Sequence, residues 1–138
     1  MSEGTVLLVD DDIDFCTANW TALEAAGFDV VVAHNGSEGL RVARENPVDI
    51  AILDVMMDSP DEGFALARNL RKEPATKSIP LVMLTSVNEV NRQAGYTFEF
   101  SDQDRDEVWL PVDKFLNKPV KPAQLVEAVR GLIKMTRE

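Results

Sequence analysis

The stretch that decides the fold is TVLLVDDD, residues 5–12, in which a short apolar run stops abruptly at three acids. A strand without polar alternation is typical of a parallel sheet covered on both faces, because neither side of such a strand meets water. The pattern recurs in IAILD, residues 50–54, where a second apolar run also ends at an acid. The sequence therefore predicts buried parallel strands with acids at their carboxyl ends.

Further runs of the same kind alternate with amphipathic segments. The predicted strands cover residues 5–9, 30–33, 50–53, 81–84 and 114–116, and the predicted helices cover residues 14–26, 37–45, 63–72 and a last segment from Pro122. In the first helix, helical spacing places Phe15, Ala18, Ala22 and Ala25 on the inward face. Strands that each precede a helix predict an α/β domain with a five-stranded parallel sheet and helices on both faces.

Polar side chains follow these strands. Asp10 and Asp11 come after the first strand, Asp54 after the third, Thr85 after the fourth and Lys118 after the fifth. We expect a flavodoxin-like three-layer sandwich with strand order 2-1-3-4-5, which makes the first and third strands neighbours. Ligands of such sheets bind at the carboxyl ends, where strand order reverses. The three carboxylates should therefore converge within a few ångströms.

Carboxylates at such short range repel one another, and a hard divalent cation would relieve that repulsion. Oxygen ligands with room for water suit Mg²⁺, and no His or Cys near these positions competes for a softer metal. A carboxylate beside Mg²⁺ is a reasonable nucleophile toward phosphorus. Lys118 as a mobile charge and Thr85 as a hydroxyl donor could complete a site for phosphoryl transfer, which depends mainly on positioning and charge neutralisation.

Four ordered motifs resemble the signatures of response-regulator receiver domains in two-component signalling. They are VDDD at residues 9–12, LDVMM at 53–57, MLTS at 83–86 and FLNKP at 115–119. The resemblance covers nearly the whole chain, and the ordered set is specific although each motif alone is weak. It implies that Asp54 is the phosphoacceptor. It also implies that Asp10, Asp11, Asp54 and the backbone carbonyl of Met56 bind Mg²⁺.

The resemblance implies a conformational switch as well. Thr85 and Phe115 would be the paired switch residues, Lys118 would contact the phosphoryl group, and the peptide bond before Pro119 would be cis. One departure from the family pattern is Asp58, which stands where the family commonly has Pro. The segment between Asp54 and Gly63 is also about one residue longer than usual, which leaves every reactive group in place.

A larger departure lies between the fourth and fifth strands, where the chain is about ten residues longer than is usual in the family. We therefore predict a single receiver domain over residues 1–138 with an atypical insertion around 87–113. Four aromatics of this insertion are Tyr96, Phe98, Phe100 and Trp109. Either they form a surface for a partner or for self-association, or they pack down over the edge of the sheet.

Composition limits the function further. The net charge of −10 argues against direct binding to nucleic acid, whose phosphates require clusters of Lys and Arg. A single cysteine, Cys16, precludes an internal disulfide and suits a reducing compartment. The first residues show no signal peptide, and no apolar run approaches the length of a membrane span. We therefore expect a cytoplasmic protein that does not enter the membrane.

The predicted function is that of a phosphoacceptor. A sensor histidine kinase or a phosphotransfer protein would phosphorylate Asp54, and the receiver would then bind a downstream protein target, with a homodimer also conceivable. The alternative is a degenerate receiver that binds proteins without phosphorylation. A phosphohydrolase of the haloacid-dehalogenase type needs a second Asp two residues after the nucleophile, and that position is Met56. We therefore expect no enzyme, at most slow Mg²⁺-dependent self-dephosphorylation.

Overall fold

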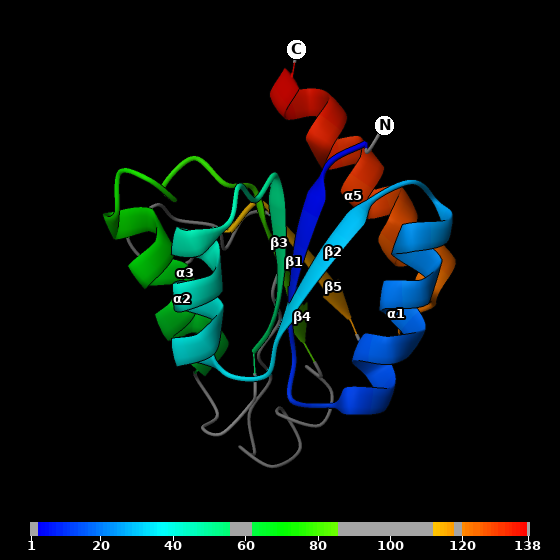
Figure 1. Ribbon diagram of the computed structural model, residues 1–138, viewed down its shortest axis with the longest axis horizontal. Helices are drawn as coiled ribbons and strands as arrows, with labels where there is room; N and C mark the ends of the chain where they lie inside the picture. The colour runs from blue at the N-terminus through cyan, green and yellow to red at the C-terminus, as the bar shows by residue number, and fades with distance from the viewer. Residues whose placement is uncertain (1–2, 56–61, 86–111, 118–119, 138) are drawn as a thin grey trace.

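The computed structural model describes residues 3–55, 62–85, 112–117 and 120–137 (Figure 1). Its elements, in chain order, are β1 (Thr5–Val9), α1 (Ile13–Ala25), β2 (Asp29–Ala33), α2 (Gly36–Glu45), β3 (Ile50–Asp54), α3 (Glu62–Lys72), β4 (Leu81–Thr85), β5 (Lys114–Asn117) and α5 (Pro122–Arg137). The strands form one parallel sheet in the order β2-β1-β3-β4-β5. The predicted flavodoxin-like topology is therefore confirmed.

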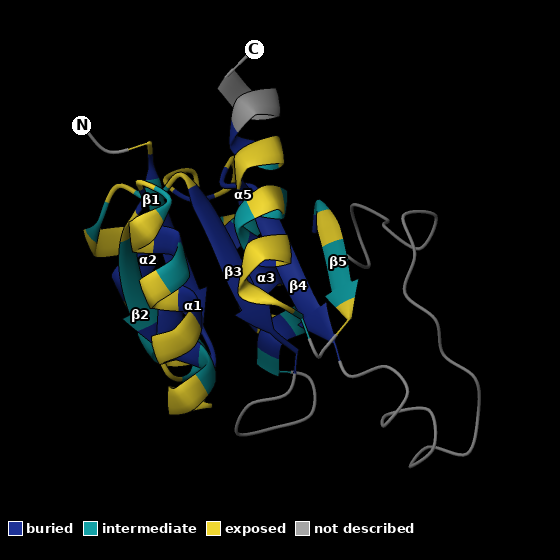
Figure 2. Ribbon diagram, turned by 90° about the vertical axis from the view of Figure 1, so that its right-hand side faces the viewer, coloured by how far each residue is buried: buried dark blue, intermediate teal, exposed yellow. Residues whose placement is uncertain are grey.

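The sheet is the middle of three layers, with α1 and α5 on one face and α2 and α3 on the other (Figure 1). Successive residues of a strand point to opposite faces. Leu7 and Val9 accordingly pack toward α2 and α3, whereas Val6 and Leu8 pack toward α1 and α5. Figure 2 shows that the central strands are buried, β3 and β4 throughout and β1 at every residue after Thr5. In the described part of the chain, no helix is long and apolar enough to span a bilayer.

The inward face of α1 agrees with the prediction at Phe15, which packs against the core, but differs at two of the alanines. Cys16, Asn19 and Leu23 are the buried residues of this helix, whereas Ala18 and Ala25 are exposed. A leucine buries far more apolar surface than an alanine, so Leu23 decides which way the helix faces. Cys16 is a small residue of the core.

Asp12 caps α1, because its Oδ1 accepts a hydrogen bond from the backbone N–H of Phe15 at 3.0 Å. We expect Asp12→Ala to lower the free energy of unfolding by about 1 kcal/mol, since an N–H of the first turn loses its acceptor. Asp12→Asn is the matched control, because its amide oxygen can accept the same bond without the charge. Urea denaturation measures both variants. An equal loss in both would mean that charge, and not capping, is what stabilises the helix.

Two contacts tie distant parts of the chain together. Arg71 donates to the backbone oxygens of Lys77 and Ile79 at 2.7 and 2.6 Å and to the carboxylate of Asp113 at 2.9 Å, which fixes the start of β5 to the end of α3. At the same end of the sheet, on its other face, Arg130 of α5 lies 3.4 Å from the carboxylate of Glu3. On the surface, the hydrogen-bonded Arg44 guanidinium lowers the pKa of the Glu73 carboxyl.

Candidate phosphoacceptor and metal site

Three carboxylates meet at the carboxyl ends of β1 and β3. Asp10, Asp11 and Asp54 each offer one oxygen, and these oxygens all lie within 4.8 Å of one another. The register places Val9 beside Leu53, so the next residue of each strand reaches the same edge of the sheet. Asp10 and Asp54 are buried and Asp11 is exposed. The cluster therefore opens to solvent on the side of Asp11.

Asp10 is held firmly by its neighbours. Its Oδ1 accepts the N–H of Asp12 at 3.0 Å. Its backbone carbonyl accepts from the Cys16 thiol at 3.4 Å and lies 3.2 Å from His34 Nδ1. A Cys and a His thus lie closer to the acids than the sequence indicated. Both residues reach the carbonyl and not the carboxylate, however, and within the described residues the cluster keeps an all-oxygen set.

Thr85 ends β4 next to the acid cluster, because the preceding residue, Leu84, is in register with Asp54 of β3. Its side chain is buried, and its hydroxyl donates to Asn117 Oδ1 on β5 at 3.0 Å. Phe115, two residues before Asn117, is half-buried and packs into the core on the α2 and α3 side. The hydroxyl predicted to serve the phosphoryl group is thus engaged with β5. Sequence reasoning passed over Asn117, although it stands in the FLNKP motif.

The first turn of α3 lies directly against the end of β3. The N–H of Gly63 donates to the carbonyl of Val55 at 2.9 Å. A Cβ at residue 63 would stand 2.7 Å from Val55 Cα and 2.8 Å from the carbonyl carbon of Asp54, closer than atoms tolerate. The preceding residue, Glu62, accepts the N–H of Gly36 and so joins the starts of α2 and α3. Gly63 therefore allows the close approach that positions α3 beside the Asp54 backbone.

We expect Gly63→Ala to lower the free energy of unfolding by about 1–3 kcal/mol, because the added methyl would meet backbone that cannot rotate away. Gly131→Ala is the matched control. Gly131 lies in the interior of α5, where an added Cβ meets nothing within 4 Å. Because alanine favours helix over glycine, the free energy of unfolding of this variant should rise slightly. Urea unfolding of both variants is the measurement. Equal free energies of unfolding for the two variants would show that the backbone at the end of β3 moves away from the added methyl at little cost.

Several predicted residues lie outside the described part of the chain. They are Met56, Asp58, Lys118, Pro119, Tyr96, Phe98, Phe100 and Trp109. Their predicted roles stay predictions. The same holds for the cis peptide before Pro119 and for most of the insertion around residues 87–113.

The sequence model of the response regulator receiver domain matches residues 6–130. The chain belongs to this family. The match contains the three clustered acids and all of the five strands except Thr5, the first residue of β1. The receiver fold and its place in two-component signalling, which the ordered motifs predicted, are therefore confirmed.

Curated relatives of this receiver domain are regulators of transcription. The transcriptional regulatory protein GltR of Pseudomonas aeruginosa is 33% identical over 132 residues, covering 94% of this chain and 49% of its own length. The probable transcriptional regulator ycf27 of Cyanophora paradoxa is 32% identical over 137 residues, covering 99% and 51%. The chain thus spans about half the length of the curated relatives it matches.

Solved receiver structures superpose along nearly the whole chain. The Francisella response regulator 1452 receiver domain has a TM-score of 0.77 at 28% identity, covering 97% of this chain and 99% of that one. The chemotaxis response regulator CheY4 of Vibrio cholerae has a TM-score of 0.75 at 28% identity, covering 94% and 98%. These likenesses agree with the strand order of the receiver described above.

Proposed function

We propose that this receiver, acting in the cytoplasm, accepts a phosphoryl group on Asp54 from a sensor histidine kinase or a phosphotransfer protein in a Mg²⁺-dependent step. The observation that carries the proposal is the convergence of Asp10, Asp11 and Asp54 at the carboxyl ends of two adjacent strands. We also propose that residues 1–138 form one domain with an insertion around 87–113. After phosphorylation, a downstream protein target would bind the altered face of the receiver.

The donor set suits Mg²⁺, which prefers oxygen ligands at about 2.0–2.1 Å and keeps some of its water. Oxygens of three carboxylates within 4.8 Å of one another can approach one cation with small side-chain movements. The backbone carbonyl of Met56 would be a further ligand. Bound Mg²⁺ would neutralise the charge that gathers on the carboxylates and on the transferring phosphoryl group.

Phosphoryl transfer requires the protein mainly to position the reacting groups and to neutralise charge. A carboxylate oxygen of Asp54 forms the new bond to phosphorus while the bond from phosphorus to the donor histidine nitrogen breaks, and Lys118 would balance charge on the phosphoryl oxygens. Asp54 is 7% exposed, so its surroundings hold the carboxylate in one place while the open side admits the donor. The product is an acyl phosphate that water removes slowly. The receiver would thus be a signalling phosphoacceptor and not an enzyme that turns over a substrate.

The switch follows from the position of the Thr85 hydroxyl. We expect beryllofluoride with Mg²⁺, a mimic of the phosphoryl group, to draw this hydroxyl away from Asn117 and toward Asp54. The equilibrium shifts because the ligand binds one arrangement better than the other. The Phe115 ring would then fill the space that Thr85 leaves. NMR spectra with and without beryllofluoride test the coupling, and unchanged environments of both Thr85 and Phe115 would refute it.

Incubation with Mg²⁺ and acetyl phosphate tests the proposed function. Intact mass should rise by one phosphoryl group, peptide mapping should place it on Asp54, and removal of Mg²⁺ with EDTA should prevent it. Absence of labelling with a folded protein would favour the alternative, a degenerate receiver that binds its partners without phosphorylation. Because the net charge is −10, we propose that any control of transcription acts through a DNA-binding region or partner outside residues 1–138.

A further inference from the structure

Two large apolar side chains of the described residues face solvent, and both lie on α1. Ile13 is 67% exposed and Trp20 is 42% exposed. A single exposed apolar residue is ordinary, but a tryptophan and an isoleucine on one short helix are informative, because tryptophan is enriched where proteins bind one another. The acid cluster explains neither residue, since neither offers a ligand atom.

These two residues share one stripe of the helix. At 100° per residue, Ile13, Thr17, Trp20 and Glu24 fall within about 60° of arc and extend over about 16 Å. The side of α1 that faces α5 lies elsewhere, because the groove between the two helices is lined from α1 by Ala22, Ala25 and Ala26. The stripe therefore looks away from α5. We call Ile13, Thr17, Trp20 and Glu24 the Trp20 face.

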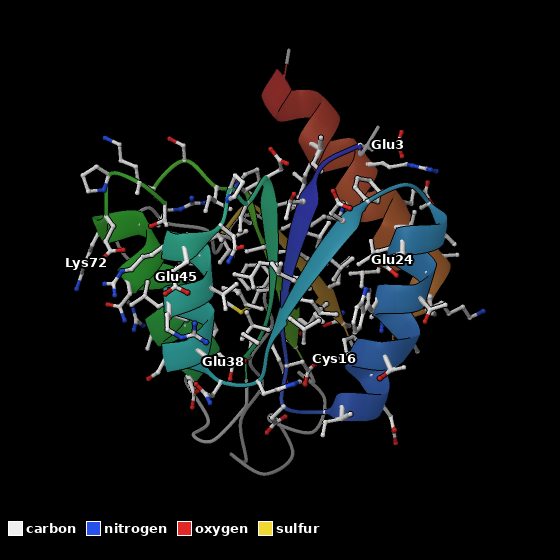
Figure 3. The ribbon with its side chains drawn as sticks, in the orientation of Figure 1. Glu3, Cys16, Glu24, Glu38, Glu45 and Lys72 are labelled. Carbon is white, nitrogen blue, oxygen red and sulfur yellow. The ribbon has the colours of Figure 1, made fainter. Side chains whose placement is uncertain are left out.

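The segment that contains α1 carries charged side chains of one sign, and the nearest basic group that the structure shows, Arg130 of α5, binds the Ala26 carbonyl off the Trp20 face. The first 40 residues contain eight acidic residues and no Lys or Arg, while the rest of the chain contains 16 acidic and 14 basic residues. Eight of the ten net negative charges thus belong to the segment that contains α1. Asp12 and Asp14 flank the face at the amino end of α1. Glu24, labelled in Figure 3, lies at the other end of the face. A second copy of this chain would bring acids against acids, which opposes self-association through this face.

We propose that the Trp20 face docks a helix of a partner protein that carries an apolar stripe flanked by Lys and Arg. The apolar stripe would cover Trp20 and Ile13, and the basic flanks would meet the acids at both ends of the face. This binding goes beyond the proposed phosphoacceptor function, because the face contains none of the three clustered acids and requires no phosphoryl group.

The probe is a labelled helical peptide of about 18 residues with leucine at every third or fourth position and lysine on the flanks, the spacing of one apolar helix face. A matched peptide carries glutamate in place of lysine. Fluorescence anisotropy with the full chain should show saturable binding of the lysine peptide only. Binding should weaken at least tenfold in Trp20→Ser, as for a central tryptophan of an interface, and also at high salt. Trp20→Ser leaves the charge unchanged, so its effect separates docking from general attraction.

Val126→Ser is the control variant, because Val126 is half-buried in the groove between α1 and α5, off the Trp20 face, and the change is also neutral. It should bind the lysine peptide like the wild type, and thermal melts confirm that each variant is folded. NMR shifts caused by the peptide should concentrate at residues 13–24. Lack of saturable binding, equal binding to Trp20→Ser, or a concentration-dependent dimer abolished by Trp20→Ser would each overturn the proposal, the last by assigning the face to a second copy.

Discussion

Asp54→Asn should abolish Mg²⁺-dependent phosphorylation while the receiver stays folded. The amide is nearly the same size as the carboxylate and fills the same buried position, but it has no anionic oxygen to bond to phosphorus. Intact mass after incubation with acetyl phosphate and Mg²⁺ measures the effect. Asp29→Asn is the matched control, because Asp29 is an exposed acid at the start of β2, at the other end of the sheet.

The control should be labelled as fully as the wild type. Labelling of Asp54→Asn at the wild-type rate would show that another group, with Asp10 and Asp11 the nearest carboxylates, accepts the phosphoryl group. A large drop in melting temperature would be a separate result. It would show that the buried carboxylate also supports the fold, and it would leave the labelling of the remaining folded protein as the deciding measurement.

Asp11→Ala should remove most of the stabilisation that Mg²⁺ gives to the receiver. Binding to the folded state alone contributes about 2.7 kcal/mol when the free ion is at 100 times its dissociation constant, and a weaker site loses this contribution. Without Mg²⁺, the variant should be more stable than the wild type, because one of three mutually repelling carboxylates is gone. Thermal melts with and without the ion measure both effects.

Asp14→Ala is the control for this experiment, since Asp14 is an exposed acid of α1 outside the cluster. It should gain as much from Mg²⁺ as the wild type does. If Asp11→Ala gains equally as well, Asp11 is not a ligand of the ion. If the apo variant is less stable than the wild type, then the repulsion among the three acids is weaker than their contribution to local structure.

The sheet was predictable because its strands are apolar on both faces, and only burial between two helical layers explains residues such as Leu7, Leu8 and Ile52. The convergence of the acids followed from strand order. The inward face of α1 was not predictable from alanine spacing, because alanine is too small to compete with Leu23. Two contacts were not predictable either, the approach of Gly63 to β3 and the hydrogen bond of the Thr85 hydroxyl to Asn117, because both depend on distances between atoms of separate elements. The spacing of apolar residues along the chain indicates which face of an element is buried, but not how closely two elements approach each other.

The contact of Glu3 with Arg130 has a practical consequence for engineering. It brings the start of β1 beside α5. Both ends of the chain lie on the side where the strands begin, opposite the clustered acids (Figure 1). A short linker could therefore join the two ends, and new ends opened in an exposed turn would give a circular permutant with the same sheet. Likewise, a receiver tethered to a sensor chip through either end would present Asp54 to the solution.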